Sequence, residues 1–342
     1  MCGRGALTLS ADRCRYVAGG NAAPNRTRLR GVERLRKKYN LGPTSYVPVI
    51  RPVVQGSADG SGACDREVCA MRWGLVPSFA KCQEDFDVFK GGSATFNARV
   101  EGAESSNLWR RLIDKQRGVV LFDGFYEWKA NGKSKVPMYI RNCDEYDGHT
   151  ISWPSKEVDV VPEEMTKTPA DLPPHAPLML AGLFDAWRQP ASTDSGDGKA
   201  PQETLESCAI LTMDPMSTPM EKVHDRMPVF LTPETAALWL DPTKNFRDII
   251  RTVLQVSQAH AQTLLLYEVA PLVSNIRNES PDCVLPKEVY DARQLSKGIG
   301  RFFKKQGKEG TSAPPATPAK RVAGTDISEL REDSSAKVIC LD

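Results

Sequence analysis

The stretch Gly118-Val119-Val120-Leu121-Phe122-Asp123-Gly124-Phe125-Tyr126-Glu127-Trp128-Lys129 joins an apolar run to a polar one through an Asp-Gly pair. Short runs of β-branched and aromatic residues bounded by Asp and Gly are typical of strands and turns. We therefore predict a strand over Gly118–Phe122 and a turn at Asp123-Gly124. Behind the turn, Glu127 stands between the aromatic residues Tyr126 and Trp128.

Further strand-like runs lie on both sides of this stretch. They are Tyr46–Ile50, Cys69–Val76, Val136–Arg141, Leu178–Phe184 and Cys208–Thr212. Apolar residues at helical spacing predict three helices, over Leu29–Tyr39, Pro233–Leu240 and Phe246–Val256. Many short strands with few helices, in no regular β-α-β alternation, predict an α+β fold with a largely antiparallel sheet or open barrel.

Three segments have compositions that do not favour a packed core. Residues 142–176 and 189–205 are rich in Pro, Asp, Glu, Ser and Gly, and we predict surface insertions there. From about residue 304 the chain is rich in Lys, Gly, Ser, Thr, Pro and Ala, which predicts a disordered tail. We therefore expect one domain over residues 2–295 and a mostly disordered segment over 296–342.

Composition and charge exclude several protein classes. No apolar run approaches the ~20 residues of a membrane span, and no secretory signal is visible, so we expect no membrane partner. Nine scattered cysteines without a CxxC pair predict reduced thiols, no metal site and no cofactor, in the nucleus or cytoplasm. Residues 1–40 hold ten Lys/Arg against two acids, which favours a polyanionic partner.

Cys2 directly follows Met1. Removing Met1 would leave an amine and a thiol on the same residue, which no internal residue can supply. An aldehyde condenses with the amine to an imine, and the thiol then closes a five-membered thiazolidine. Both groups are partly in their nucleophilic form near neutral pH, because their reference pKa values are about 8 and about 8.5.

Four internal stretches combine polar residues with apolar or glycine-bearing surroundings. They are Met71–Pro77, Phe96–Glu101, Asp123–Lys129 and His224–Pro228. Together with Met1-Cys2-Gly3-Arg4, and in this order, they resemble the SOS response-associated peptidase family from Cys2 to about residue 290. The resemblance implies a compact α+β domain around a curved antiparallel sheet, with a positively charged DNA groove. It also implies binding of single-stranded DNA and covalent capture of abasic sites through the N-terminal cysteine.

The candidate catalytic residues are Cys2, Asn97, Glu127 and His224. His224 can exchange protons near neutral pH. The ionised form of Glu127 is disfavoured among aromatic side chains, so this carboxyl group can donate a proton, and the resemblance gives it a role at the abasic sugar and in releasing the crosslink. Asn97 can hold an amine or a sugar hydroxyl by hydrogen bonds.

The candidate DNA-binding residues come from several motifs. Arginine forks match phosphate oxygens, and the resemblance adds a turn and a threonine. The set comprises Arg4, Asn40, Pro43, Phe79, Arg99, Thr212 and Arg226. Phe79 and Ala80 stand where many family members carry tryptophans that wedge against unstacked bases, and Phe79 can still stack.

Two tail segments resemble partner motifs. Ser296–Phe303 is similar to a sliding-clamp docking motif, with Ser296 in place of the usual Gln, and an ordinary packed helix or strand is the alternative. Val338–Leu341, among acidic and serine residues, is similar to a SUMO-interacting motif that adds a strand to a partner sheet.

These observations predict a nuclear, monomeric DNA repair protein. It would sense abasic sites in single-stranded DNA or at junctions of replication forks, form a thiazolidine crosslink by a lyase-like reaction, and shield the lesion. Two alternatives remain open at this point. One is a non-covalent reader of modified cytosine, and the other is a cysteine peptidase that acts mainly on its own N-terminus. Whether Met1 is removed by the protein itself or by a methionine aminopeptidase is left open as well.

Overall fold

Five strands form a closed barrel in the computed structural model of the protein, which describes residues 3–19, 27–53, 66–143, 176–188 and 204–295. The strands pair in the order β11-β10-β7-β4-β5, and β11 pairs in parallel with β5 through Ser207↔Arg72 and Cys208↔Trp73, which closes the ring. Their bounds are β4 Tyr46–Pro52, β5 Arg66–Trp73, β7 Arg117–Phe122, β10 Leu178–Arg188 and β11 Thr204–Met213. Four short strands extend this sheet, namely β2 Thr27–Arg30 on β5, β6 Asn97–Arg99 and β12 Met227–Pro228 on β11, and β13 Phe230–Leu231 on β10.

A second, five-stranded antiparallel sheet carries the N-terminal segment. Its order is β14-β9-β8-β1-β3, with β1 Gly5–Leu7, β3 Lys38–Leu41, β8 Gly124–Asn131, β9 Ser134–Asn142 and β14 Leu264–Glu268. The chain passes from the barrel to this sheet at Asp123, between β7 and β8. The Asp123 N–H donates to the Ala6 carbonyl oxygen at 2.9 Å, so the predicted turn is a bend between two sheets.

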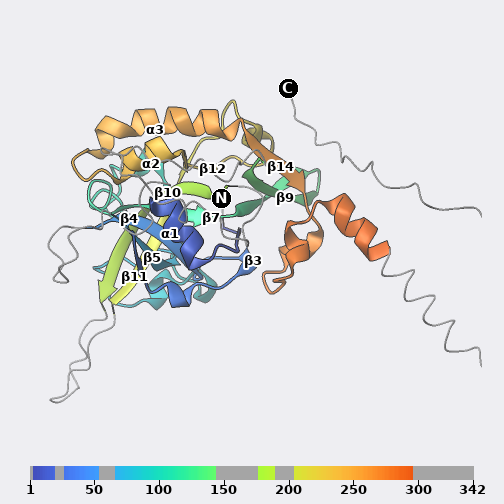
Figure 1. Ribbon diagram of the computed structural model, residues 1–342, viewed down its shortest axis with the longest axis horizontal. Helices are drawn as coiled ribbons and strands as arrows, with labels where there is room; N and C mark the ends of the chain where they lie inside the picture. Colours follow the sequence, from blue (N-terminus) through green and yellow to red (C-terminus); the bar gives the residue numbers. More distant parts are fainter. Residues whose placement is uncertain (1–2, 20–26, 54–65, 144–175, 189–203, 296–342) are drawn as a thin grey trace, which may run out of the picture. The chain divides into compact units, whose positions relative to one another are not determined.

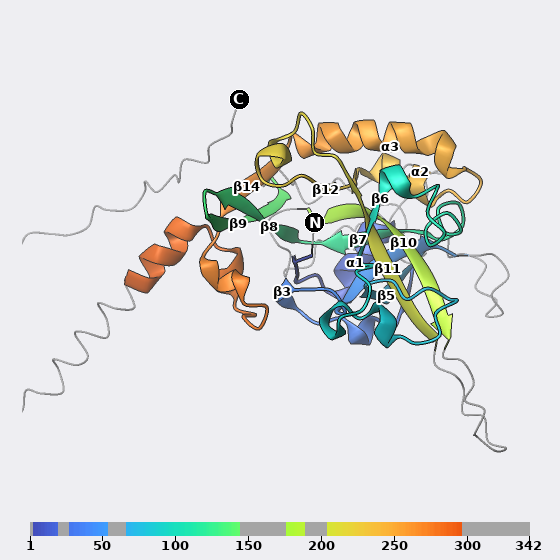
Figure 2. The ribbon, with the colours of Figure 1, turned by 180° about the vertical axis from the view of Figure 1, so that it is seen from behind.

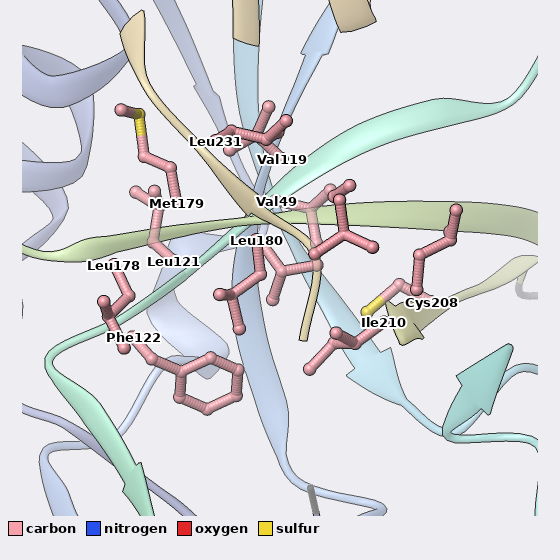
Figure 3. Close-up of a cluster of buried hydrophobic side chains, with 14 of the residues drawn as sticks. Val49, Val119, Leu121, Phe122, Leu178, Met179, Leu180, Cys208, Ile210 and Leu231 are labelled. Carbon is pink, nitrogen blue, oxygen red and sulfur yellow. The ribbon is translucent and has the colours of Figure 1, made fainter. Parts of the chain in front are cut away.

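The barrel interior forms the main apolar core. All six residues of β7 are buried, which explains why its sequence from Gly118 to Phe122 is continuously apolar and does not alternate. Figure 3 shows Val49, Leu180 and Ile210 from three strands on one side of the sheet, while Val119 lies with Leu231 on the other side.

Three α-helices, α1 to α3, pack on the sheets, and a further helix in the described residues spans 287–295. Helix α1 (Ala11–Gly19) lies against β2 and β5, while α2 (Pro233–Leu240) and α3 (Phe246–Ala261) lie together on another side of the barrel (Figures 1 and 2). Helix α3 buries residues at helical spacing, and the Ser257 hydroxyl oxygen in this buried row accepts a bond from the Phe230 N–H at 2.9 Å. Helix α1 was not predicted.

Short 3-10 helices make up several connections. They are η2 Val32–Arg34, η3 Glu84–Phe86, η4 Val88–Lys90, η5 Val100–Gly102, η7 Pro219–Lys222, η8 Pro271–Ser274 and η9 Pro281–Val284.

The α+β class and the largely antiparallel, barrel-like sheet are confirmed, and the predicted helix over Leu29–Tyr39 is wrong. That segment contains β2, η2 and β3, because its ends pair with β5 and β1. Gly31 between them has a φ of 66°, in the left-handed region that interrupts a helix. Tertiary strand pairing therefore overrides the local apolar spacing.

The chain divides into two compact units, Met1–Arg293 and Gln294–Asp342, and all elements above belong to the first. Most of the predicted insertions 142–176 and 189–205, and the tail motifs Ser296–Phe303 and Val338–Leu341, lie outside the described residues. Among the residues that are described, no helix is both long and apolar enough to cross a membrane.

Candidate active site

The N-terminal segment runs along β8. Strand β1 pairs with β8 through Gly5↔Phe125, and the Tyr126 N–H donates to the Arg4 carbonyl oxygen at 3.0 Å. Continuing this antiparallel register places Gly3 opposite Glu127. Cys2 lies outside the described residues, but it is the next residue in the chain, and consecutive Cα atoms are about 3.8 Å apart.

The Glu127 carboxyl group is buried. Glu127 lies on β8 between Tyr126 and Trp128, and only 4% of its surface is exposed. Removal from water raises the pKa of Glu127 to about 7, and the nearby Asp225 carboxylate adds to this shift. Both protonation states of Glu127 are therefore populated at neutral pH, as a proton donor and acceptor requires.

His224 faces this carboxyl group. Its Nε2 lies 3.9 Å from Glu127 Oε2, and its Nδ1 accepts a bond from the Arg226 N–H at 3.1 Å and lies 2.6 Å from Asp225 Oδ1. Burial lowers the pKa of His224, although Asp225 opposes the shift. The distance to Glu127 exceeds a hydrogen bond, so a third polar atom can bond to both groups. His224 also borders a surface hollow of about 560 Å³, which gives solvent access.

Arg226 is held in a bidentate ion pair. Its Nη1 and Nη2 donate to the Glu101 carboxylate oxygens at 2.8 Å each, and Nη2 donates to the Thr212 carbonyl oxygen at 2.5 Å. Burial raises the pKa of Glu101, but the bonds from Arg226 outweigh it and the net shift is downward. The Thr212 hydroxyl points inward and donates to the Ala98 carbonyl oxygen at 3.4 Å. A DNA contact by Arg226 or Thr212 stays a prediction.

Asn97 and Arg99 lie on β6 next to this cluster. They pair with Ile210 and Thr212 of β11, and the buried Ala98 separates them. Residues two apart share one face of a strand, so Asn97 and Arg99 point the same way. Arg99 is exposed, whereas Asn97 is half-buried. The face that carries them therefore adjoins the Arg226–Glu101 pair.

Arg4 and Asn40 fasten the N-terminal segment to η8. Arg4 Nη1 donates to Asn40 Oδ1 at 2.8 Å and to the Val273 carbonyl oxygen at 3.0 Å, and its guanidinium lies 5.6 Å from the centre of the Trp128 ring. Asn40 is 1% exposed and also donates to the Val273 oxygen at 3.0 Å. Pro43, which follows in the same turn, is buried. These contacts give Arg4 and Asn40 a structural role whether or not they also reach DNA.

Phe79 projects into solvent, with 62% of its surface exposed. The Arg111 guanidinium covers one face of the ring at 5.0 Å, and it bonds to Ser78 Oγ at 3.0 Å and to the buried Asp185 carboxylate. Ala80 points inward instead, and its carbonyl oxygen accepts the Trp187 indole N–H at 2.8 Å. The sequence contains no pattern that would have linked Arg111 and Asp185 to Phe79.

Strand pairing thus brings the N-terminal segment, a buried carboxyl group and an imidazole together, with arginine side chains on adjoining strands. This arrangement defines a class of site, namely an acid–base pair beside the N-terminal segment, where the five-stranded sheet adjoins the barrel. Sequence comparison identifies the family. The profile of the SOS response associated peptidase (SRAP) family matches residues 1–276, and the chain belongs to this family.

Curated relatives cover most of the chain. The abasic site processing protein HMCES of Gallus gallus is 33% identical over 301 residues, which are 84% of this chain and 79% of the relative. The Xenopus tropicalis protein of that name is 32% identical over 83% of this chain and 78% of its own length. The abasic site processing protein YoqW of Bacillus subtilis is 28% identical over 72% of this chain and 84% of its own length.

A solved structure has the same fold. The crystal structure of a protein from Bacteroides thetaiotaomicron covers 83% of this chain and 99% of its own, with a TM-score of 0.54 and 20% identity. This likeness supports the barrel architecture described above.

Proposed function

We propose that this protein captures abasic sites in single-stranded DNA as a covalent adduct with Cys2. The observation that carries the proposal is the pair of the buried Glu127 and the half-buried His224, because it supplies acid and base groups where the N-terminal segment reaches Gly3, the residue after Cys2. Family membership and relatives named abasic site processing proteins support the choice of substrate.

The reaction joins an aminothiol to an aldehyde. Once Met1 is removed, the Cys2 amine attacks the carbonyl carbon of the ring-opened abasic sugar, and the resulting carbinolamine loses water to form an imine. The Cys2 sulfur then bonds to the imine carbon, and its proton ends on nitrogen. The product is a thiazolidine, and the net reaction releases one water molecule without an oxidant or reductant.

Glu127 and His224 have complementary roles in this scheme. Protonated Glu127 donates to the departing hydroxyl group, which makes it a better leaving group. His224 has a lowered pKa and is neutral at pH 7, so it accepts a proton from the attacking amine or from the thiol. Asn97 orients the amine or the sugar by hydrogen bonds.

Single-stranded DNA suits this site better than duplex DNA. An abasic sugar inside a continuous duplex has to rotate out from between stacked, paired neighbours before it reaches the Glu127–His224 pair, at a cost of up to a few kcal/mol. In this scheme Arg99, whose side chain is exposed, contacts a phosphate next to the site. We therefore expect faster crosslinking on single strands and on single–double strand junctions than on a continuous duplex.

Intact mass spectrometry tests the covalent step. Protein that begins at Cys2 is mixed with single-stranded DNA carrying one abasic site, and the expected product has the mass of both partners less one water molecule. Cys2→Ser keeps the amine and forms only a reversible imine, and Cys2→Ala likewise loses ring closure. A denaturant-stable adduct at wild-type yield in either variant would refute the thiazolidine.

Two comparisons separate this function from the alternatives. A fixed N-terminal tag, verified by mass, keeps the thiol but blocks the amine, and it should abolish crosslinking. Full crosslinking by the tagged protein would indicate that Cys2 acts as a thiol alone, as in a peptidase. Equal rates on single-stranded, junction and duplex DNA of one sequence would instead favour a reader of modified bases. Nuclear localisation, the clamp and SUMO contacts of the tail, and the monomeric state remain further proposals.

A further inference from the structure

A second hollow, of about 370 Å³, is lined by strands of the barrel and by the connection from β5 to β6. Its volume is within the range of pockets that hold small ligands. The lining residues include Thr44, Tyr46, Arg72, Gln83, Asp87 and Trp187. None of them belongs to the acid–base site or to the residues predicted to contact DNA, so this hollow is a separate feature of the molecule.

Arg72 of β5 brings a buried positive charge to the hollow. Only 4% of its surface is exposed, and its guanidinium donates to the carbonyl oxygens of Gly74 and, at 3.4 Å, Phe86. Its Nη2 lies 3.9 Å from Asp87 Oδ2, at the outer limit of an ion pair. Burial lowers the pKa of Arg72, and the Asp87 carboxylate offsets only part of this shift. The positive charge is therefore only partly compensated, and an anion placed beside it would be stabilised.

Neutral hydrogen-bond donors line the same hollow. Thr44 and Tyr46 each carry a hydroxyl group, and Gln83 carries an amide. The exposed Arg34 donates from Nη1 to the Tyr46 hydroxyl oxygen at 3.4 Å, and its guanidinium lies 5.4 Å from the centre of the Tyr46 ring. Because the Tyr46 oxygen accepts this bond, its own proton is available to an anion. Arg34 also adds a second positive charge next to Tyr46.

Apolar side chains complete the wall of the hollow. Trp187 is buried, and its indole N–H already donates to the Ala80 carbonyl oxygen at 2.8 Å, so the ring offers the hollow only apolar surface. Leu205 lies beside it in the wall. Apolar walls lower the local dielectric constant, which strengthens the attraction between a guanidinium and an anion.

The backbone at Thr44 is strained. Its φ is 72°, in the left-handed region that β-branched residues rarely adopt. Two hydrogen bonds hold it there, from the Thr44 N–H to the Trp73 carbonyl oxygen at 2.6 Å and from the Trp73 N–H to the Ser45 carbonyl oxygen at 2.8 Å. Glycine would fit this backbone at lower cost, and such strain is concentrated at ligand sites. The presence of threonine therefore favours a role for its side chain.

We propose that this hollow is a binding site for a phosphate group, held by the Arg72 guanidinium and by the hydroxyl groups of Thr44 and Tyr46. A phosphate group is negatively charged and has several acceptor oxygens, which match a guanidinium fork and adjacent hydroxyl donors. Asp87 competes with the anion for Arg72, because both are negatively charged. Free phosphate and the phosphodiester of a nucleic acid strand share this chemistry, and the experiment separates them.

The test titrates inorganic phosphate into the full-length protein at constant ionic strength, with chloride as the balancing anion. Calorimetry should show saturable binding, and the melting temperature should rise with phosphate concentration. Tyr46→Phe removes one hydroxyl donor and should weaken binding about tenfold. Asp87→Asn should tighten binding, because it removes the competing charge while its amide oxygen can still accept the Phe89 N–H.

Arg34→Gln and Arg36→Gln form a matched pair of exposed arginines. Arg34→Gln should weaken phosphate binding, whereas Arg36 bonds to the carbonyl oxygens of Glu33 and Leu35, so Arg36→Gln should not. Each variant is compared with the wild type by its melting temperature without phosphate, so that loss of folding is not mistaken for loss of binding.

Three results would overturn the proposal. They are no saturable binding at millimolar phosphate, wild-type affinity in folded Tyr46→Phe and Asp87→Asn variants, and equal weakening by Arg34→Gln and Arg36→Gln. Undamaged single-stranded DNA then distinguishes the source of the phosphate group. A strand that displaces bound phosphate places its own backbone in the hollow, whereas a strand that binds alongside phosphate identifies a site for the free anion.

Discussion

The Glu127 carboxyl group and the His224 imidazole have pKa values shifted in opposite directions because both side chains are withdrawn from water. Burial disfavours the charged form of each, which raises the pKa of the acid and lowers that of the base. Neither residue type is unusual in the sequence. Their environment is what adapts them to proton exchange near neutral pH.

Glu127→Gln should change the pH dependence of stability. The folded pKa of about 7 is above the reference value of 4.5, so the folded state binds this proton more tightly than the unfolded state. The resulting stabilisation is complete below about pH 4.5 and is lost as pH rises through 7. Glutamine cannot ionise. The unfolding free energy of the variant should therefore rise relative to that of the wild type, by on the order of 1–3 kcal/mol, as pH increases from 4.5 to above 7. Urea unfolding from pH 4.5 to 8.5 measures this difference.

Glu101→Gln provides a control of opposite sign. The pKa of Glu101 is lowered by its bonds to Arg226, so its stabilisation is present at neutral pH and is lost as pH falls. This variant should be less stable than the wild type near pH 7, and the difference in their unfolding free energies should decrease as the pH falls. If the difference between the Glu127→Gln variant and the wild type were the same at every pH, the raised pKa of Glu127 would be contradicted. Glu127→Gln should also slow adduct formation.

Arg4 and Arg99 should respond differently to substitution. Arg4→Ala removes partners of the buried Asn40 and of the Val273 carbonyl, so it should lower the free energy of unfolding by about 1–3 kcal/mol. Arg99 is exposed, so Arg99→Ala should leave stability within about 0.5 kcal/mol of the wild type. It should weaken single-strand binding and lower the slope of log K against log salt by about one. Denaturation and salt titration measure both effects, and a stable Arg4→Ala variant would argue against its structural role.

At the scale of the elements, the passage from β7 to β8 determines where Glu127 lies. Strand β7 belongs to the barrel and β8 to the five-stranded sheet, with the bend at Asp123 between them. The Asp123 carboxylate accepts the Thr8 N–H at 2.5 Å, and burial raises the pKa of Asp123 to about 6. This bend also aligns β1 with β8, so one local feature positions both the acid and the N-terminal segment.

Gly124→Ala should disrupt this junction. A Cβ there would lie 2.5 Å from Tyr139 Oη and 2.6 Å from the Ile140 carbonyl oxygen, and backbone cannot move aside cheaply. We expect a loss of at least about 1–3 kcal/mol in unfolding free energy and slower crosslinking. Gly102→Ala is the control, because no heavy atom lies within 4 Å of its added Cβ. Thermal unfolding measures the stability of both variants. If the Gly124→Ala variant were as stable as the Gly102→Ala variant, the close packing at Gly124 would not be required.

At the scale of the whole molecule, the proposed site is built within one unit. The barrel, the five-stranded sheet and every described candidate residue belong to Met1–Arg293. The ring of strand pairings joins β5 to β11, and β7 of the same ring leads directly into β8, so distant parts of the sequence keep a fixed geometry at the site.

Deleting residues 294–342 should therefore leave folding and chemistry intact. We expect one cooperative thermal transition with a midpoint within about 4 °C of the full chain, and equal crosslinking yields on single-stranded DNA. A large loss of stability or of crosslinking in the truncated protein would contradict the predicted domain boundary.

Local patterns in the chain were enough for the class of the fold and for most strands. Runs such as Gly118–Phe122 and Leu178–Phe184 are apolar because both faces of those strands are buried, and buried positions select apolar residues. The motifs around Glu127 and His224 were visible for a similar reason, since a polar residue inside an apolar run is uncommon. Leu29–Tyr39 was mispredicted because its state depends on partners far along the chain, β5 and β1.

Distances and environments depend on how the strands close on one another. The 3.9 Å between Glu127 and His224, the pairing of Arg226 with Glu101, and the use of Arg4 to hold Asn40 each join residues many positions apart. Periodicity and composition record whether a residue is buried. Which side chains meet, and how their pKa values shift, follows from non-local pairing and the desolvation that it imposes.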